Sequence, residues 1–347
     1  METEKNKKRK KKYFLMLISI FLIGVLLIFS AYAWFSTSLN VRVKTFNMIV
    51  TKNSGLTISF DAINYDSFVE ISEDMLIKKL KETYPNNTSQ WSGNGLIPVS
   101  TAGISNPNTH IFDIFWSEGV IYKNSRVREN GWVRTTLTDE SYRRSVNRYI
   151  AFDVFLKNVT GSPIDDNLYF DTDSQITIDG EISEEMMGLI NSIRIGLVKV
   201  GSAPLKTSYQ EVQNITCNNN CESIIFEPYS KQHTDLSIER AQKYGLELVN
   251  GERFPTYAYI KEANKMQVAD TISGSPKLDM NYFKLQETIT EEDFDKPLFQ
   301  IPNGVTKVRI YVWLEGQDID SLETDSEGAD IDISISFVKD TAGYTSN

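Results

Sequence analysis

Histidine and cysteine are both scarce in this chain, which has two residues of each among 347. The histidines, His110 and His233, lie too far apart to form the His-Glu-x-x-His motif of a zinc protease. The sequence also lacks the Gly-x-Ser-x-Gly motif of serine hydrolases and a phosphate-binding glycine-rich loop. A carboxylate pair for glycoside hydrolysis has no fixed spacing, so that alternative stays open. We therefore expect a protein that is not an enzyme.

Charged residues are absent between Lys12 and Arg42. Residues 13–35 form an apolar run of 23 residues, and about 20 such residues suffice for a helix to cross a bilayer. Residues 1–12 are basic, and a basic flank stays on the cytoplasmic side. We expect a cytoplasmic region 1–12, a transmembrane signal-anchor or signal peptide 13–35, and an extracellular domain 36–347, with the membrane as a partner.

The apolar segment has features of both a retained anchor and a removed signal. Its length exceeds the apolar core of about 7–15 residues that is usual in a signal peptide. The triplet Ala31-Tyr-Ala33, however, resembles a cleavage site with small residues. Two outcomes are therefore expected: a single-pass cell-membrane protein with its N-terminus inside, or a secreted protein cleaved near Ala33.

The net charge of −10 is unevenly distributed. Residues 1–12 carry seven bases and two acids, a net charge of +5, so the rest of the chain carries −15. An acidic domain is a poor partner for nucleic acid, because phosphate neutralisation requires a basic face.

The residues beyond the apolar run have the alternating pattern of β-strands, rich in β-branched and aromatic side chains. The strands are expected at 41–50, 56–60, 111–116, 132–137, 149–159, 168–170, 175–178, 193–200, 307–314 and 331–338. Short helices are expected at 73–84, 183–190 and 236–244. The stretches 85–108 and 213–233 are polar and suggest long excursions. The predicted fold is mainly β, a jelly-roll or Ig-like antiparallel β-sandwich with short helical insertions.

Four segments resemble parts of one known family. They are 31–35 (Ala-Tyr-Ala-Trp-Phe), 149–158 (Tyr-Ile-Ala-Phe-Asp-Val-Phe-Leu-Lys-Asn), 297–303 (Pro-Leu-Phe-Gln-Ile-Pro-Asn) and 308–318 (Val-Arg-Ile-Tyr-Val-Trp-Leu-Glu-Gly-Gln-Asp). The family is the TasA/camelysin-like group of Gram-positive surface and biofilm-matrix proteins, whose export often depends on the SipW type of signal peptidase. The resemblance implies a jelly-roll-like domain at the cell surface or in extracellular matrix. Some members form fibres, in which the N-terminal strand of one subunit completes the sheet of the next.

The strand at 41–50 follows the apolar segment closely and is the candidate for such assembly. Val41, Val43 and Thr45 alternate with other side chains, and Phe46 begins an apolar stretch. An extended segment of this kind can pair with the open edge of a neighbouring sheet and so build a homopolymer. The alternative is that it is the first strand of its own domain.

Carboxylates are concentrated between residues 318 and 332. Asp318, Asp320, Glu323 and Asp325 are candidate calcium ligands, because oxygen ligands at this density suit a hard cation. Their spacing does not match an EF-hand loop. The alternative is a solvated acidic loop between two strands, with no cofactor bound.

Cys217 and Cys221 are separated by three asparagines. Outside the cell such a pair can close a small disulfide loop. Free thiols or a metal site are the alternatives, although no histidine lies nearby in the sequence for zinc.

Two features suggest a ligand at the cell surface. Trp91 lies in a polar segment and is the best tryptophan for stacking on a sugar, whereas Trp313 is expected in the core. A basic group suits an anionic wall polymer: Lys123, Arg126, Arg128, Arg134, Arg143, Arg144 and Arg148. The sequence therefore favours a non-enzymatic surface or matrix structural protein that can form fibres. A calcium-assisted adhesion module for glycans or wall polymers is the alternative.

Overall fold

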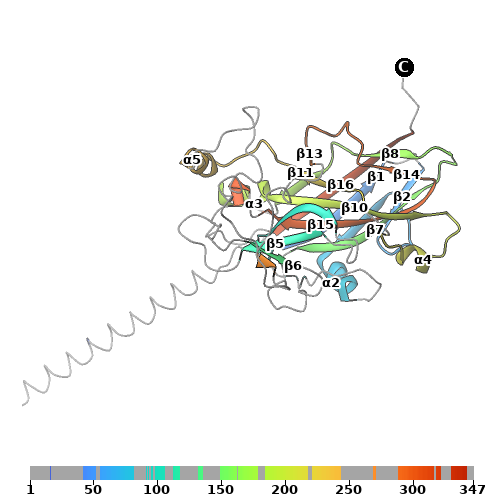
Figure 1. Cartoon of the computed structure of the whole chain (residues 1–347), viewed down its shortest axis with the longest axis horizontal. Coiled ribbons are helices and arrows are strands. Elements are labelled where there is room, and N and C mark those ends of the chain that lie inside the picture. The colour runs from blue at the N-terminus through green and yellow to red at the C-terminus, as the bar shows by residue number, and fades with distance from the viewer. Residues whose placement is uncertain are drawn as a thin grey trace, which may run out of the picture.

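The computed structural model describes most of the predicted extracellular domain. The described residues are 16, 42–51, 55–81, 91, 93, 95–96, 98–105, 112–117, 132–135, 149–161, 163–178, 184–217, 221–243, 269–270, 288–315, 318–321 and 330–341. Within these residues the protein is mainly β, as the sequence predicts. Two six-stranded sheets and one smaller sheet hold the strands (Figure 1).

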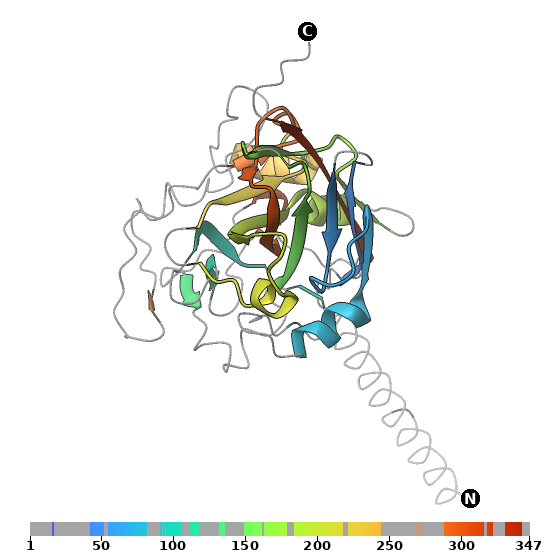
Figure 2. The ribbon, with the colours of Figure 1, turned by 90° about the vertical axis from the view of Figure 1, so that its right-hand side faces the viewer.

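The first sheet contains both the first and the last described strands. Its members are β14 (Phe299–Ile301), β8 (Asp166–Phe170), β16 (Asp330–Thr341), β1 (Arg42–Val50) and β3 (Phe68–Ser72), in that order, with β9 (Gln175–Ile178) also paired to β16. β1 pairs with β16 in parallel and with β3 in antiparallel orientation. The first strand is therefore an interior strand of this sheet, and Figure 2 shows it in blue beside the red of β16.

The two central strands of the second sheet are each 11 residues long. Its order is β13 (Thr288–Thr290), β11 (Ser223–Glu227), β10 (Ile193–Ala203), β15 (Gly304–Leu314), β7 (Ile150–Asn158) and β2 (Leu56–Ser59). β15 is buried along its whole length. Val308 and Ile310 belong to the core shared with the first sheet, while Lys307 and Arg309 alternate with them on the other face.

The largest hydrophobic cluster among the described residues contains side chains from both large sheets. The ring of Phe46 in β1 meets that of Phe152 in β7 edge to face, with centroids 5.0 Å apart. The rings of Phe170 in β8 and Phe226 in β11 are tilted by 35° to each other, with centroids 4.5 Å apart. In β16 four alternate side chains, which share one face of the strand, are all buried: Ile331, Ile333, Ile335 and Phe337. Burial of these rings and branched side chains is the main driving force for joining the sheets.

The smaller sheet and the helices lie around this core. The sheet has the order β12 (Ala269–Asp270), β6 (Trp132–Thr135), β5 (Phe112–Ser117) and β4 (Ser100–Ser105). The helices are α2 (Glu73–Lys81), α3 (Glu184–Asn191), α4 (Tyr209–Gln213), α5 (Asp235–Lys243) and the single-turn η4 (Ile319–Ser321). α3 and α5 lie toward one end of the large sheets, and α4 lies toward the other (Figure 1).

Side-chain caps explain where two of these helices begin. The backbone N–H of Met75 donates to the Ser72 hydroxyl, which therefore caps α2. The cap of α5 precedes its first residue. The hydroxyl of Thr234, rather than the Asp235 side chain, accepts a bond from the N–H of Ser237.

Two sequence expectations are corrected by the topology. The sheets are mixed rather than antiparallel, because β1–β16, β11–β13 and β12–β6 are parallel pairs. Long connections separate the members of each parallel pair, so no hairpin fixes their relative direction. The stretch 213–233 is also not simply an excursion, since it contains β11 in the second sheet.

The predicted membrane segment 13–35 lies outside the described residues except for Met16. Within the part of the chain that the structure describes, no helix is long and apolar enough to cross a membrane.

Replacement of Phe46 by alanine tests the role of β1 in the shared core. We expect Phe46→Ala to lower the free energy of unfolding by about 3–5 kcal/mol, because a buried ring leaves a cavity. Phe68→Ala is the matched control, because Phe68 in the neighbouring strand β3 is 45% exposed and should cost about 0.5 kcal/mol. Denaturant unfolding measures both values, and equal losses would contradict the assigned packing.

Candidate functional site

The predicted assembly strand is held on both sides within its own domain. Val43 and Phe46 are buried, Thr45 is half-buried, and Val41 lies outside the described residues. Thr45 is paired with Asp332 of β16 and with Ser72 of β3. In this chain β1 thus completes its own sheet, and its transfer to another subunit stays a prediction.

Charged side chains fix the beginning of β1 to its surroundings. The Lys44 ammonium lies 2.8 Å from a carboxylate oxygen of Asp330, at the start of β16. The guanidinium of Arg42 donates to Glu73 at 3.5 Å, at the start of α2. Both pairs are partly exposed, so each contributes about 0–1 kcal/mol. Neither pair therefore does much to hold β1 in its sheet, whose register is specified by the buried face of the strand.

Two of the four candidate calcium ligands are buried in an ionic cluster. Asp318 accepts hydrogen bonds from the Arg194 guanidinium and, at 2.8 Å, from the backbone N–H of Asp320. One carboxylate oxygen of Asp320 lies 2.6 Å from Nδ1 of His233, and the other accepts a hydrogen bond from the backbone N–H of Thr234 at 3.0 Å. Both carboxylates therefore hold η4 against other parts of the chain.

Arg194 is the centre of this ionic cluster. It lies at the start of β10 and is almost fully buried. Besides Asp318, it donates to Glu227 at the end of β11 at 2.7 Å and to the carbonyl oxygens of Asn191 and Ile193. Its planar guanidinium suits several acceptors at once. Arg194 therefore joins α3, β10, β11 and η4 through one side chain.

The ionic cluster changes the protonation of its members. Burial raises the pKa of Asp318 to about 6, although the Arg194 charge opposes this, and nearby Asp320 and Glu227 add to the increase. Burial disfavours the His233 imidazolium. The hydrogen bond and charge of Asp320, with the charges of Asp318 and Glu227, outweigh burial and raise the pKa of His233. The excess of carboxylates in this cluster thus favours the protonated forms of His233 and Asp318.

The calcium hypothesis stays a prediction. Glu323 and Asp325, the other two candidate ligands, lie outside the described residues. Among the residues that are described, no group of three or more His, Cys, Asp or Glu side chains is arranged to hold a metal ion. Asp318 and Asp320 would have to exchange Arg194 and His233 for the cation.

A second buried ionic group lies on the outer face of the second sheet. Asp153 in β7 accepts two hydrogen bonds from Arg309 in β15, at 2.7 and 2.9 Å, and lies 3.2 Å from the ammonium of Lys307. Burial opposes ionisation of Asp153, but the two cations outweigh it and lower its pKa. Lys307 also donates to the carbonyl oxygens of Gln213 and Ile215. The group thereby attaches α4 to the sheet.

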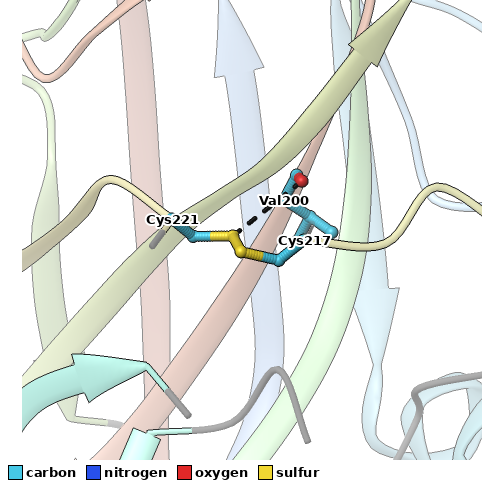
Figure 3. The surroundings of a disulfide bond; sticks show 3 residues. All are labelled: Val200, Cys217 and Cys221. Carbon is cyan, nitrogen blue, oxygen red and sulfur yellow. Dashed lines mark hydrogen bonds between the residues drawn. A yellow bond between two sulfur atoms is a disulfide. The ribbon is translucent and has the colours of Figure 1, made fainter. Parts of the chain in front are cut away.

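Cys217 and Cys221 form a disulfide in the structure (Figure 3). The bridge closes a loop between α4 and β11, and Sγ of Cys221 lies 3.9 Å from the carbonyl oxygen of Val200 in β10. Cys217 is buried, and Cys221 packs against a small cluster that includes Trp313. The disulfide therefore fixes a connection against the second sheet.

The tryptophan interpretation is partly wrong. Trp91, the proposed sugar-stacking residue, is only 3% exposed and belongs to the main core. Its polar sequence neighbours concealed this burial. Trp313 is buried, as predicted, and its indole N–H donates to Glu315 at 3.0 Å. The basic group 123–148 lies outside the described residues, except for the backbone of Arg134 in β6.

Segments 149–158, 297–303 and 308–318 are neighbours in space. β7 is paired with β15 along its length. The amide of Asn158 at the end of β7 donates to the carbonyl oxygens of Ile301 and Pro302, at the end of β14. The segments thus form one structural unit across both large sheets.

Comparisons with known proteins identify no relative: no family model, curated protein or solved structure matches the chain.

The variant His233→Gln tests whether a protonated His233 stabilises the folded protein. Because the folded pKa is raised, the stabilisation is full below the unfolded value of about 6.5 and is lost as pH rises through the folded value. We expect the free energy of unfolding of the wild type to exceed that of His233→Gln by about 1–2 kcal/mol near pH 5.5, and by less near pH 9. Thermal unfolding at several pH values measures the difference.

The remaining cluster members define the control for this experiment. Asp318, with its pKa raised to about 6, also loses stabilisation as pH rises from its ordinary 3.8 toward that value. Comparing wild type with variant at each pH removes the part of this contribution that does not depend on the charge of His233. When the same comparison is made in protein that also carries Asp320→Asn, the effect of His233→Gln on the free energy of unfolding should lose most of its pH dependence. A difference that is independent of pH would contradict a charged His233–Asp320 pair.

A calcium titration tests the acidic stretch. If the candidate ligands bind, the protein should release or absorb heat on calcium addition. Its unfolding free energy should rise by about 2.7 kcal/mol when calcium is a hundredfold above the dissociation constant. A variant with both Glu323→Gln and Asp325→Asn should lose both effects. Calorimetry with magnesium as the control ion checks selectivity, and the absence of heat in the wild type would remove calcium from consideration.

Proposed function

We propose that this protein is a non-enzymatic structural protein of the cell surface or extracellular matrix, with a jelly-roll-like or Ig-like β-sandwich as its body. One observation carries the proposal. The apolar run 13–35 is followed within a few residues by β1, and β1 lies between β16 and β3 rather than at a sheet edge. The connection to the membrane therefore enters the domain through an interior strand.

This arrangement is suited to carrying a load. A pull on residues before Arg42 is directed along β1, so its backbone hydrogen bonds to two neighbours are loaded together rather than opened one after another. The parallel register with β16 extends from Arg42 to Val50, and the antiparallel register with β3 extends from Thr45 to Ile49. Buried Phe46 adds resistance on the core side. Such an attachment fits a tethered display protein.

The same strand supports fibre assembly if the apolar segment is removed. Cleavage near Ala33 releases a subunit with a short extension before Arg42. Withdrawal of β1 from its own sheet would expose a slot between β16 and β3, and β1 of a second copy has the matching sequence and register. Repeated head-to-tail exchange would give an open polymer.

The native N-terminus distinguishes tethered protein from released subunit. We expect an intact chain in the membrane fraction, or a chain that begins near Trp34 in the medium. Mass spectrometry of protein from both fractions measures this. An N-terminus within 42–50 in both fractions would contradict the proposal, because β1 would then be absent or truncated in the mature protein.

Electron microscopy tests polymerisation of the released form. Fibres are expected from the protein of the medium. Phe46→Ala should weaken them, because Phe46 anchors the exchanged strand, whereas Phe68→Ala serves as the control. Wild-type protein that stays monomeric at high concentration, with and without calcium, would remove the fibre form of the proposal.

A further inference from the structure

Three polar side chains meet in a buried site between the two large sheets. Asn158 ends β7 of the second sheet, Asp166 begins β8 of the first, and Lys339 lies near the end of β16. Asn158 is 1% exposed and Asp166 is 0% exposed, while the Lys339 side chain is 4% exposed. A primary amine, a carboxamide and a carboxylate are thus removed from water together.

Each of the three groups contacts the other two. Nζ of Lys339 lies 2.7 Å from Oδ1 of Asn158 and 2.8 Å from Oδ2 of Asp166. Nδ2 of Asn158 donates to the same Asp166 oxygen at 2.9 Å. Because a carbonyl bond is about 1.2 Å long, the amide carbon of Asn158 lies within about 4 Å of the amine, near the distance from which an intramolecular attack proceeds.

The surroundings hold this geometry. Nδ2 of Asn158 also donates to the carbonyl oxygens of Ile301 and Pro302, each at 3.3 Å, and the Thr160 hydroxyl donates to Asp166 at 3.2 Å. Lys339 is fixed by pairing of its backbone position with Leu168 of β8. Groups placed on paired strands are more firmly oriented than groups on loops.

We propose that Lys339 and Asn158 form an intramolecular isopeptide bond, with Asp166 as the proton carrier. The Lys339 ammonium first gives a proton to the Asp166 carboxylate and becomes a neutral amine. Nζ then attacks Cγ of Asn158, with the protonated Asp166 donating to the amide oxygen. Nζ loses a second proton as Nδ2 gains one, the Cγ–Nδ2 bond breaks, and ammonia leaves with the remaining proton as ammonium. The products are a secondary amide and the original carboxylate, with no oxidant or cofactor required.

Burial favours this reaction over a permanent ion pair. A charged amine removed from water carries a large desolvation cost, and the proposed product replaces it by a neutral amide. Exclusion of water also prevents hydrolysis of the reacting amide. An ion pair would require only Lys339 and Asp166, and it leaves unexplained the carboxamide placed against both.

The bond would connect the two large sheets covalently. Its ends are 181 residues apart in the sequence, and it would join the last strand of the first sheet to β7 of the second. This inference stands apart from the proposed function, since it concerns chemistry within one chain. It would nevertheless make the domain harder to unfold by heat or by force.

Trypsin digestion of the folded full-length chain tests the bond directly. Without it, cleavage after Lys157, Arg194, Arg309 and Lys339 releases peptides 158–194 and 310–339. With it, acylated Lys339 resists trypsin, and 158–194 remains joined to 310–347 in a species that is lighter by one ammonia. We expect this linked species after reduction of the disulfide, with fragmentation placing the link between Asn158 and Lys339.

Three variants separate the chemistry from packing. Lys339→Arg keeps the positive charge but lacks a nucleophilic amine, Asn158→Ala removes the reacting amide, and Asp166→Asn removes the proton acceptor. Each should give unlinked peptides, and Lys339→Arg should stay folded by circular dichroism while unfolding at a lower temperature than the linked wild type. Unlinked peptides from aged, folded wild type would overturn the proposal. So would a 158–194 peptide that has lost ammonia without being linked, and a linked species in Asp166→Asn would overturn the role of that carboxylate.

Discussion

The parallel pairing of β1 with β16 is the constraint on which the rest of the domain depends. It brings together strands from the two ends of the domain, and their inner side chains supply much of one wall of the core. Phe46 of β1 and Phe337 of β16 are both fully buried. Closing so long a loop costs conformational entropy, although the cost grows only slowly with length. The apolar area buried between the sheets must offset it, so the first sheet and the shared core form together.

Among the residues that the structure describes, ionic groups lie outside the layer between the sheets, except for the Lys339 site at its margin. In β15 the inward side chains are apolar, whereas Lys307 and Arg309 face outward and are covered by other parts of the chain. Arg194 similarly gathers carboxylates where β10 begins. A buried charge requires its partners in defined positions. These ionic groups therefore specify how the strands of the second sheet are aligned and where α4 and η4 pack against it. The apolar layer supplies most of the stability.

The sequence predicted the long strands β7, β10, β15 and β16 well, because their large apolar side chains recur at every second position and face the shared core. It missed six strands that are short or lie in stretches that read as polar: β3, β4, β11, β12, β13 and β14. Parallel pairing was also not predicted, since partners far apart in sequence leave no local signal. For the candidate sites the limit was similar. Asp318 and Asp320 were identified as a group, but Arg194 and His233, which bind them, are distant in sequence. Contact among Asn158, Asp166 and Lys339 likewise becomes visible only in the fold.

The position of β1 has a consequence for biogenesis. A chain that is synthesised from its N-terminus presents β1 long before its partner β16. Val43, Phe46 and Met48, buried in the finished domain, must wait without β16 until residues 330–341 have emerged. Through that interval β1 is an unpaired strand that a neighbouring chain can use as a template. The local concentration of unfinished chains therefore affects the folding yield separately from the stability of the finished domain.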